Sequence, residues 1–117
     1  MTKYNLKPIE VPKIKTKHRC IKTKLPVPES LIIINDLIKT EPQSMMGQPP
    51  IVWHKADGFS IYDKWGNKWI DWSSCVLISN AGHGRKEISN AISKMLKQGL
   101  LATYVFIHEK RAILTRD

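Results

Sequence analysis

The chain has 117 residues, of which 42% are hydrophobic, and it carries a formal net charge of +9 at pH 7. This length is enough for one modest domain with its own core, and it excludes a large two-domain enzyme. A net charge of this sign favours polyanionic partners, so its distribution along the chain matters.

Most of the positive charge lies at the N-terminal end. Met1–Lys24 contains eight basic residues and one acidic residue, Glu10, whereas the other 93 residues carry a net charge of +2. This segment shows no helical or strand period, so residues 1–27 are predicted to form a basic, flexible, extended tail. Such tails are usually solvated, so nucleic acid is not expected as a partner, although binding of nucleic acid through the tail is kept as an alternative.

The cysteines and the apolar segments bear on the cellular compartment. Cys20 and Cys75 are 55 residues apart, with no C-x-x-C pattern, which supports neither a disulfide framework nor a zinc module. The N-terminus lacks the apolar stretch of a signal peptide, and the longest aliphatic run, Leu31–Ile34, is too short to span a bilayer. We therefore expect a cytoplasmic protein with no membrane partner.

A short amphipathic helix is predicted after the tail. Apolar residues recur there at a spacing of three to four: Leu31, Ile34, Leu37 and Ile38. The helix opens at Pro28-Glu29-Ser30 and stops before Pro42. The prolines and glycine that follow predict an irregular connection, so residues 28–50 are interpreted as a helix and a linker.

Beyond residue 50 the apolar period changes to two, which is typical of strands. Three short runs are rich in β-branched and aromatic residues: Ile51–His54, Phe59–Asp63 and Lys68–Trp72. The separators are Ala56-Asp57-Gly58 and Lys64-Trp65-Gly66-Asn67, in which Gly58 and Gly66-Asn67 tolerate the positive φ angles of tight turns. The pattern predicts a three-stranded antiparallel meander.

Two further helices are predicted after a loop rich in serine and small residues. In residues 85–98, apolar side chains share one face: Ile88, Ala91, Ile92, Met95 and Leu96. Gly99 is suited to end this helix. Residues 109–117 have the composition of a third helix but neither a cap nor a completed apolar face. Together these elements predict an α+β fold.

The residues of the meander also carry a resemblance to a known family. Asp57–Trp72 resembles the opening of class III pyridoxal-phosphate-dependent aminotransferases: Gly, a short strand, Asp-x-x-Gly-Asn, then aromatic-Ile-Asp-aromatic. The resemblance continues through Ser73-Ser74-Cys75, Asn80-Ala81-Gly82-His83 and Asn90-Ala91-Ile92, and so covers about residues 50–117. One departure is Gly84-Arg85-Lys86, where the family usually has a proline that opens the helix.

The resemblance implies a fold and an activity. Residues 51–117 would be the N-terminal part of the small domain of an aspartate-aminotransferase-like, fold type I enzyme, truncated before the large domain. The implied reaction transfers an amino group between an amine or amino acid and a keto acid or aldehyde. Its cofactor would be pyridoxal 5'-phosphate, and the full-length protein would be a homodimer. The groups that bind the cofactor, including the Schiff-base lysine, would lie outside this chain, which alone is expected to be inactive.

The resemblance also implies residues that contact substrate. Ser73, Ser74, Cys75 and Val76 would form one wall of the substrate pocket, and Phe106, in the segment Thr103–His108, would flank the substrate. Small hydroxyl and thiol side chains can contact a ligand without filling its space, so Cys75 is predicted to line the pocket rather than to act as a nucleophile. The alternatives are an ordinary polar loop for residues 73–77 and core packing for Phe106.

No catalytic, cofactor-binding or metal-binding residue is predicted in this chain. The four histidines show no H-x-x-x-H or cysteine-linked spacing and no spacing to a base partner, and His83 is interpreted as a structural part of the Gly-His turn. The lysines, including Lys64, Lys68, Lys86 and Lys94, are expected to be solvated and protonated. Two alternatives to an aminotransferase segment stay open: a non-enzymatic remnant or interaction module, and a basic nucleic-acid-binding protein.

Overall fold

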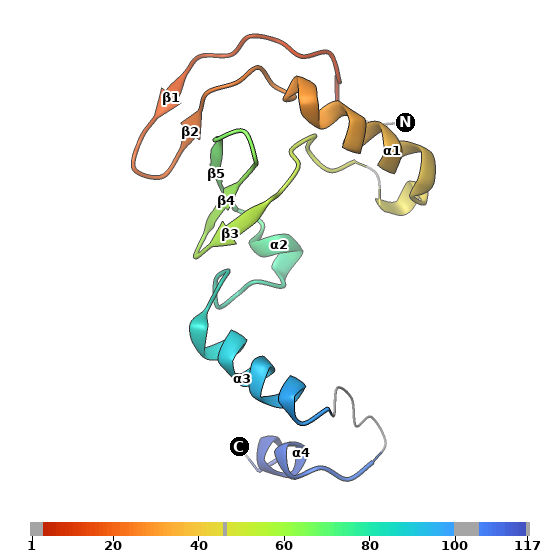
Figure 1. Cartoon of the computed structure of the whole chain (residues 1–117), viewed down its shortest axis with the longest axis vertical. Coiled ribbons are helices and arrows are strands. Elements are labelled where there is room, and N and C mark those ends of the chain that lie inside the picture. Colours follow the sequence, from red (N-terminus) through yellow and green to blue (C-terminus); the bar gives the residue numbers. More distant parts are fainter. Residues whose placement is uncertain (1–3, 46, 100–105, 117) are drawn as a thin grey trace. The chain divides into compact units, whose positions relative to one another are not determined.

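The structure, a computed structural model, describes residues 4–45, 47–99 and 106–116. The chain divides into two compact units, Met1–His83 and Gly84–Asp117. The first unit contains an antiparallel sheet and a helix, and the second is helical (Figure 1). The fold is therefore mixed α and β. No helix in the described part of the chain is long and apolar enough to cross a membrane.

The sheet of the first unit has five strands in the order β1-β2-β5-β4-β3, all antiparallel. These strands are β1 (Ile14–Lys15), β2 (Cys20–Ile21), β3 (Lys55–Asp57), β4 (Ser60–Tyr62) and β5 (Lys68–Ile70). The predicted three-stranded meander is present as β3, β4 and β5, and its second and third strands lie within the predicted runs.

The predicted position of the first meander strand is wrong. The strand lies at Lys55–Asp57, not at Ile51–His54, and includes residues that were assigned to a turn. Asp57 pairs with Ser60, so the hairpin turn is only two residues long and begins at Gly58, which has a φ of 55°. A two-residue turn of this kind needs positive φ at its first position, and glycine provides it at low cost, so the residues before Gly58 are free to pair.

The basic N-terminal segment takes part in the sheet. β1 and β2 form a hairpin in which Lys15 lies opposite Cys20, and Cys20 also pairs with Lys68 of β5. Residues 1–27 were predicted as a flexible extended tail; the structure shows that strands within this segment extend the meander. Strands of two residues are too short to produce a visible alternation in the sequence, and therefore pattern analysis did not find them.

The side chain of Asn67 joins this hairpin to the meander. Asn67 is fully buried, and its Oδ1 accepts a hydrogen bond from the backbone N–H of Lys22 at 2.7 Å. Its Nδ2 donates to Thr23 Oγ1 at 2.8 Å and to Asp63 Oδ2 at 2.7 Å. Both donors and the acceptor of the amide are therefore used inside the protein. Asn67 was expected to serve the β4–β5 turn, and it also holds the end of β2.

The two faces of the sheet differ in character. Ile21 and Ile61 are buried and belong, with Val27, to the apolar core. Neighbouring residues on a strand point to opposite faces, so Tyr62 and Cys20 lie on the other side, which carries several lysines. One face of the sheet thus contributes buried apolar side chains to the core, and the other face is polar.

The helix of the first unit, α1 (Leu31–Thr40), agrees with the prediction. It follows a 3₁₀ turn at Pro28–Ser30 and ends at Glu41, whose backbone is extended. Proline at residue 42 disfavours a helical conformation for the residue before it, which accounts for the end of the helix.

The second unit contains the other two predicted helices, α3 (Lys86–Lys97) and α4 (Glu109–Leu114). The expectation that the last helix lacks a cap was wrong. His108 Nδ1 accepts a hydrogen bond from the backbone N–H of Lys110 at 3.1 Å. Histidine is not among the residues usually preferred at this position, so this cap could not be predicted from residue type.

Candidate functional site

The segment after β5 forms a left-handed helical turn. This element, α2 (Ser74–Leu77), has positive φ at all four residues, from 49° to 66°. For L-amino acids such a conformation costs roughly 1–2 kcal/mol per residue, and it is most unusual for a β-branched residue such as Val76. Strain of this kind persists only where the surroundings enforce it, and it is concentrated at functional sites. We call Ser74–Leu77 the left-handed turn.

Asp71 provides the contacts that hold the left-handed turn. Its Oδ1 accepts hydrogen bonds from the backbone N–H and the hydroxyl of Ser73, at 3.0 and 2.9 Å. Its Oδ2 accepts from the backbone N–H of Cys75 and from His83 Nε2, both at 2.8 Å. The Asp71 side chain is only 4% exposed. One buried carboxylate therefore fixes both the start of the turn and the loop that carries His83.

The Gly82-His83 pair docks on the β3–β4 hairpin. The His83 N–H donates to the Gly58 carbonyl at 2.7 Å, and the Gly58 N–H donates to the His83 carbonyl at 2.9 Å. Gly82 has a φ of 86°, and a Cβ at this position would lie 3.4 Å from the Gly58 oxygen, so a side chain would be strained there. The His83 ring also meets Trp53 edge-on, with 5.9 Å between ring centroids. These contacts give His83 a structural role.

The surroundings of Asp71 favour its ionised form. Burial raises the pKa of this carboxyl, but the hydrogen bonds from the His83 side chain, the Ser73 side chain and the backbone of Cys75 and Ser73 lower it, and the pKa is held below its usual value. With four hydrogen bonds already accepted, the Asp71 carboxylate acts as an anchor for the backbone. It is not placed to exchange protons with a ligand.

A hollow of about 500 Å³ opens beside the left-handed turn. The residues that line it are Gln48, Pro49, Ile51, Trp53, Ile61, Trp69, Ile70, Asp71, Trp72, Ser73, Cys75 and Val76. Most of this wall is apolar or aromatic, and a few side chains such as Gln48, Asp71 and Ser73 contribute polar atoms. This composition is typical of sites for small organic ligands.

The structure brings together three of the residues predicted to contact substrate. Ser73, Cys75 and Val76 line the hollow, and Ser74 belongs to the same turn without lining it. The Ser73 hydroxyl is engaged with Asp71, and it also accepts from the Val76 N–H at 3.4 Å, so it caps the turn. The Cys75 thiol is free and half-buried.

The fifth residue predicted to contact substrate is Phe106. Phe106 belongs to the second unit and is 75% exposed. Residues 100–105, which include Thr103, lie outside the described residues. The prediction for Phe106 thus stays a prediction.

The contact between Asp71 and His83 was missed in the sequence, where no histidine showed a partner at regular spacing. The two residues are 12 apart and come from a strand end and a loop, so no periodicity links them. Ser79 Oγ lies 3.4 Å from His83 Nδ1, which gives the order of a serine-histidine-aspartate relay. However, neither Ser79 nor His83 lines the hollow, and the Ser–His distance is long for a nucleophile and its base.

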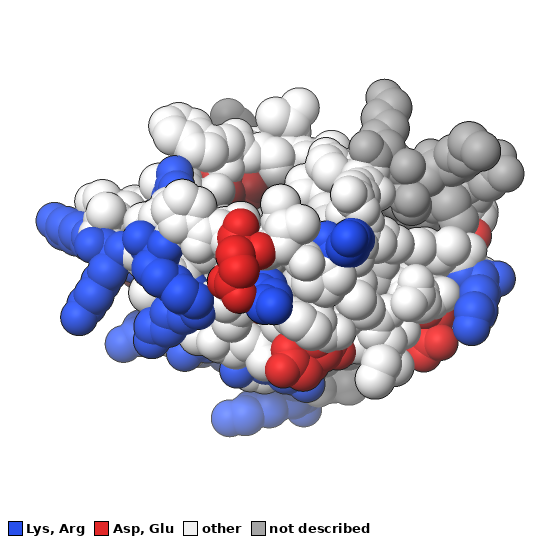
Figure 2. Space-filling view, turned by 90° about the horizontal axis from the view of Figure 1, so that it is seen from above, with Lys and Arg blue, Asp and Glu red and all other residues white. Residues whose placement is uncertain are grey.

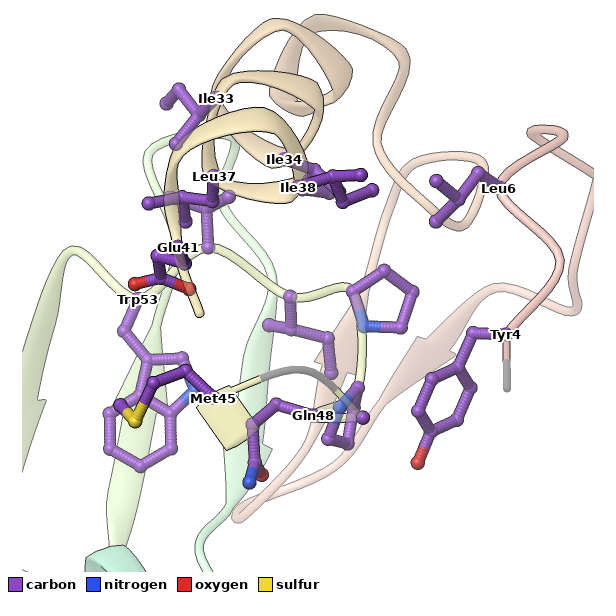
Figure 3. Close-up of a pocket in the computed structure, with 15 residues that line it drawn as sticks. Tyr4, Leu6, Ile33, Ile34, Leu37, Ile38, Glu41, Met45, Gln48 and Trp53 are labelled. Atoms are coloured by element: carbon purple, nitrogen blue, oxygen red, sulfur yellow. The ribbon is translucent and has the colours of Figure 1, made fainter. Parts of the chain in front are cut away.

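A second concave surface follows α1 and is almost entirely apolar. Ile34 and Ile38 of α1 point toward Leu6, and Met45 and Trp53 also line this surface (Figure 3). The only carboxylate among its lining residues is Glu41, and no lysine, arginine or histidine lines it. This groove lacks the paired polar groups that catalysis requires.

The described part of the chain contains no group of three His, Cys, Asp or Glu side chains that could hold a metal ion. Comparison with known proteins finds no matching family model, and no curated protein matches the chain. Function must therefore be inferred from the geometry of the first unit and from the residues of the Asp57–Trp72 motif.

The strain in the left-handed turn can be measured. We expect Val76→Gly to raise the free energy of unfolding by up to about 1 kcal/mol, because glycine adopts positive φ without strain, and the relief exceeds its entropic cost. Val76 is 67% exposed, so little packing is lost. The matched control is Ile32→Gly at an exposed position of α1 in the same unit, where a loss of about 1 kcal/mol is expected. Urea unfolding measures both changes. Equal losses for the two variants would show that the turn is not strained.

Proposed function

We propose that this chain is the N-terminal part of the small domain of a class III, pyridoxal-phosphate-dependent aminotransferase, and that the left-handed turn forms one wall of its substrate pocket. The observation that carries the proposal is the anchoring of Ser73 and Cys75 by the buried Asp71, beside an apolar hollow that Val76 also lines. Asp71 belongs to the aromatic-Ile-Asp-aromatic motif, so the residue that carries the resemblance also builds the site.

The arrangement suits recognition better than chemistry. A backbone held in a strained conformation by one buried carboxylate keeps the Cys75 and Val76 side chains in fixed positions. Fixed side chains on a rigid support bind a ligand with little loss of conformational entropy. The wall would place the apolar part of an amine or amino acid, and the identity of residues 75 and 76 would tune which substrate fits.

The residues present do not fit a complete cofactor site. The hollow is lined by no lysine or arginine, so it offers no cationic side chain for a phosphate group and no amine for a Schiff base with an aldehyde. Under this proposal the chemistry of amino-group transfer belongs to parts of the parent protein outside this sequence. The first unit contributes the shape and polarity of one wall.

The exposed apolar surface of the turn supports a role within a larger assembly. Three consecutive residues, Val76, Leu77 and Ile78, are 67%, 78% and 79% exposed, and Trp72, just before the turn, is 89% exposed. Contiguous exposed apolar side chains on soluble proteins usually mark a surface that another structure covers. In the proposed parent enzyme, a homodimer, the large domain or the second subunit would cover them.

The proposal is tested on the protein expressed from the complete reading frame that contains these residues. We expect the protein to release pyridoxal phosphate on denaturation, which mass spectrometry detects. We also expect it to transfer amino groups from an amine to a keto acid. We expect Cys75→Val to change KM for the amine more than kcat, because the wall contacts substrate rather than the reacting atoms. The 117-residue chain alone, mixed with the cofactor, is expected to be inactive.

Two results would contradict the proposal. One is a complete protein that contains no pyridoxal phosphate and transfers no amino group. The other is amino-group transfer by the 117-residue chain, because that would require a cofactor lysine within it. The control variant Asp57→Asn, at an exposed position outside the hollow, is expected to keep KM unchanged.

A further inference from the structure

The polar face of the sheet carries a straight row of side chains that crosses all five strands. Cross-strand partners on adjacent strands lie side by side on the same face. The observed register places five residues in such a row: Lys15, Cys20, Lys68, Tyr62 and Lys55. Lysine occupies the first, third and fifth positions. With strands about 4.8 Å apart, neighbouring lysines of the row are about 10 Å apart.

Two lysines of the row also line a concave surface, together with lysines outside the row. Four lysines line a hollow of about 650 Å³ on this face: Lys22, Lys55, Lys64 and Lys68. His54 and Tyr62 line it as well. The ammonium groups of Lys55 and Lys68 lie 5.1 and 5.6 Å from the centre of the Tyr62 ring. The ring therefore holds two cations over the middle of the sheet.

Negative charge that could neutralise this surface is scarce. Asp63 is the only carboxylate that lines the hollow, and it is buried and accepts hydrogen bonds from Asn67 and from the backbone of Trp65. In the next cross-strand row, Asp57 lies at the β3 edge. Among the described residues, the lysines of this hollow form no ion pair with an acidic side chain.

This distribution differs from that of an ordinary solvated surface. Opposite charges placed across strands stabilise a sheet, whereas like charges placed close together destabilise it. This face carries lysines from several strands and turns of the sheet and one available carboxylate at its edge. It therefore favours an anionic partner. Figure 2 shows many of the lysine and arginine side chains gathered toward the left end of the visible face.

We propose that this face binds the phosphodiester backbone of single-stranded nucleic acid, without sequence preference. The row is linear and spans the width of the sheet, so it matches a linear polyanion rather than a single phosphate. The spacing of about 10 Å between lysines corresponds to about three nucleotides of a stacked strand. A strand can enter the hollow, whereas a flat bilayer cannot. The inference is independent of the aminotransferase proposal, because it uses the opposite face of the sheet.

The test is the binding of a fluorescein-labelled oligouridylate to the whole protein, followed by fluorescence anisotropy between about 50 and 200 mM salt. We expect affinity to fall linearly with salt on logarithmic axes. The variant Lys15→Gln/Lys55→Gln/Lys68→Gln should bind at least tenfold more weakly at low salt. It should also reduce the slope by about 2, since each phosphate contact on a single strand contributes about 0.7.

The control variant is Lys86→Gln/Lys94→Gln/Lys97→Gln in α3, which removes the same charge from a different element. We expect it to bind as the unmodified protein does, and circular dichroism shows whether either variant has lost its fold. The proposal is overturned if the oligonucleotide does not bind, or if both variants weaken binding equally. It is also overturned if vesicles containing phosphatidylserine bind the row and the oligonucleotide does not displace them.

Discussion

Replacing Asp71 by alanine is expected to lower the free energy of unfolding by about 3 kcal/mol, because four hydrogen bonds to a buried carboxylate are lost at once. Two of their donors are backbone N–H groups at Ser73 and Cys75. The left-handed turn should relax without them, since its strain is no longer opposed. Asp71→Asn, which keeps one acceptor oxygen, should cost less.

The effect of Asp71 should depend on pH in a defined direction. Burial raises the pKa of the Asp71 carboxyl, but the hydrogen bonds from His83, Ser73 and Cys75 together lower it by more, so its folded-state pKa lies below its usual value. An aspartate in an unfolded chain has a pKa of about 3.9. The stabilisation from ionised Asp71 is therefore complete above that value and is lost as the pH falls through the lower, folded-state pKa.

Urea unfolding between about pH 2 and pH 7 measures this dependence. The difference between the unmodified protein and Asp71→Asn should be constant at neutral pH and should shrink below about pH 4. The control is Asp57→Asn, an exposed aspartate at the end of β3, for which a change below about 0.5 kcal/mol is expected. A difference that stays constant down to the lowest pH would show that the charge of Asp71 does not matter.

The second large effect is expected at Asn67. We expect Asn67→Ala to lower the free energy of unfolding by about 3 kcal/mol, since three side-chain hydrogen bonds in a fully buried site are lost. The substitution should also loosen one part of the structure, the β1–β2 hairpin, more than the rest. Without Oδ1 of Asn67, the N–H of Lys22 has lost its acceptor, and the β1–β2 hairpin is held to β5 mainly by the Cys20–Lys68 pairing.

Hydrogen exchange followed by mass spectrometry measures this release. Peptides that cover residues 14–22 should exchange faster in Asn67→Ala, while peptides that cover β4 should change less. Asn35→Ala, at an exposed position of α1, is the control and should leave exchange in the hairpin unchanged. If the hairpin exchanges at the same rate in all three proteins, Asn67 does not hold it.

The three regular helices were predictable from the sequence, and the small strands were not. The apolar period of α1 and the face of α3 extend over ten residues or more, so they are visible without tertiary information. β1 and β2 have two residues each, and their pairing depends on the buried amide of Asn67, more than 40 residues away. β3 was misplaced because the length of a hairpin turn is set by backbone geometry rather than by composition.

The candidate site was predicted in part. The resemblance singled out Ser73–Val76, and three of these residues, Ser73, Cys75 and Val76, line a hollow, while their contact with a substrate stays a prediction. The handedness of the turn was not predicted, because a serine, a cysteine, a valine and a leucine show no preference for positive φ. The role of Asp71 was hidden for a related reason: its partner His83 is brought to it by the docking of a loop on Gly58, which is a tertiary event.

The pairing of β2 with β5 also constrains the order in which the protein assembles during synthesis. Cys20 leaves the ribosome 48 residues before its partner Lys68, and β4 and β5 can pair with each other before β2 has any place to dock. Contacts between distant residues form later than local ones because closing a long loop is entropically unfavourable. During this interval the unpaired N-terminal segment is protected by its own charge: its lysines repel similar strands on neighbouring nascent chains and so limit aggregation.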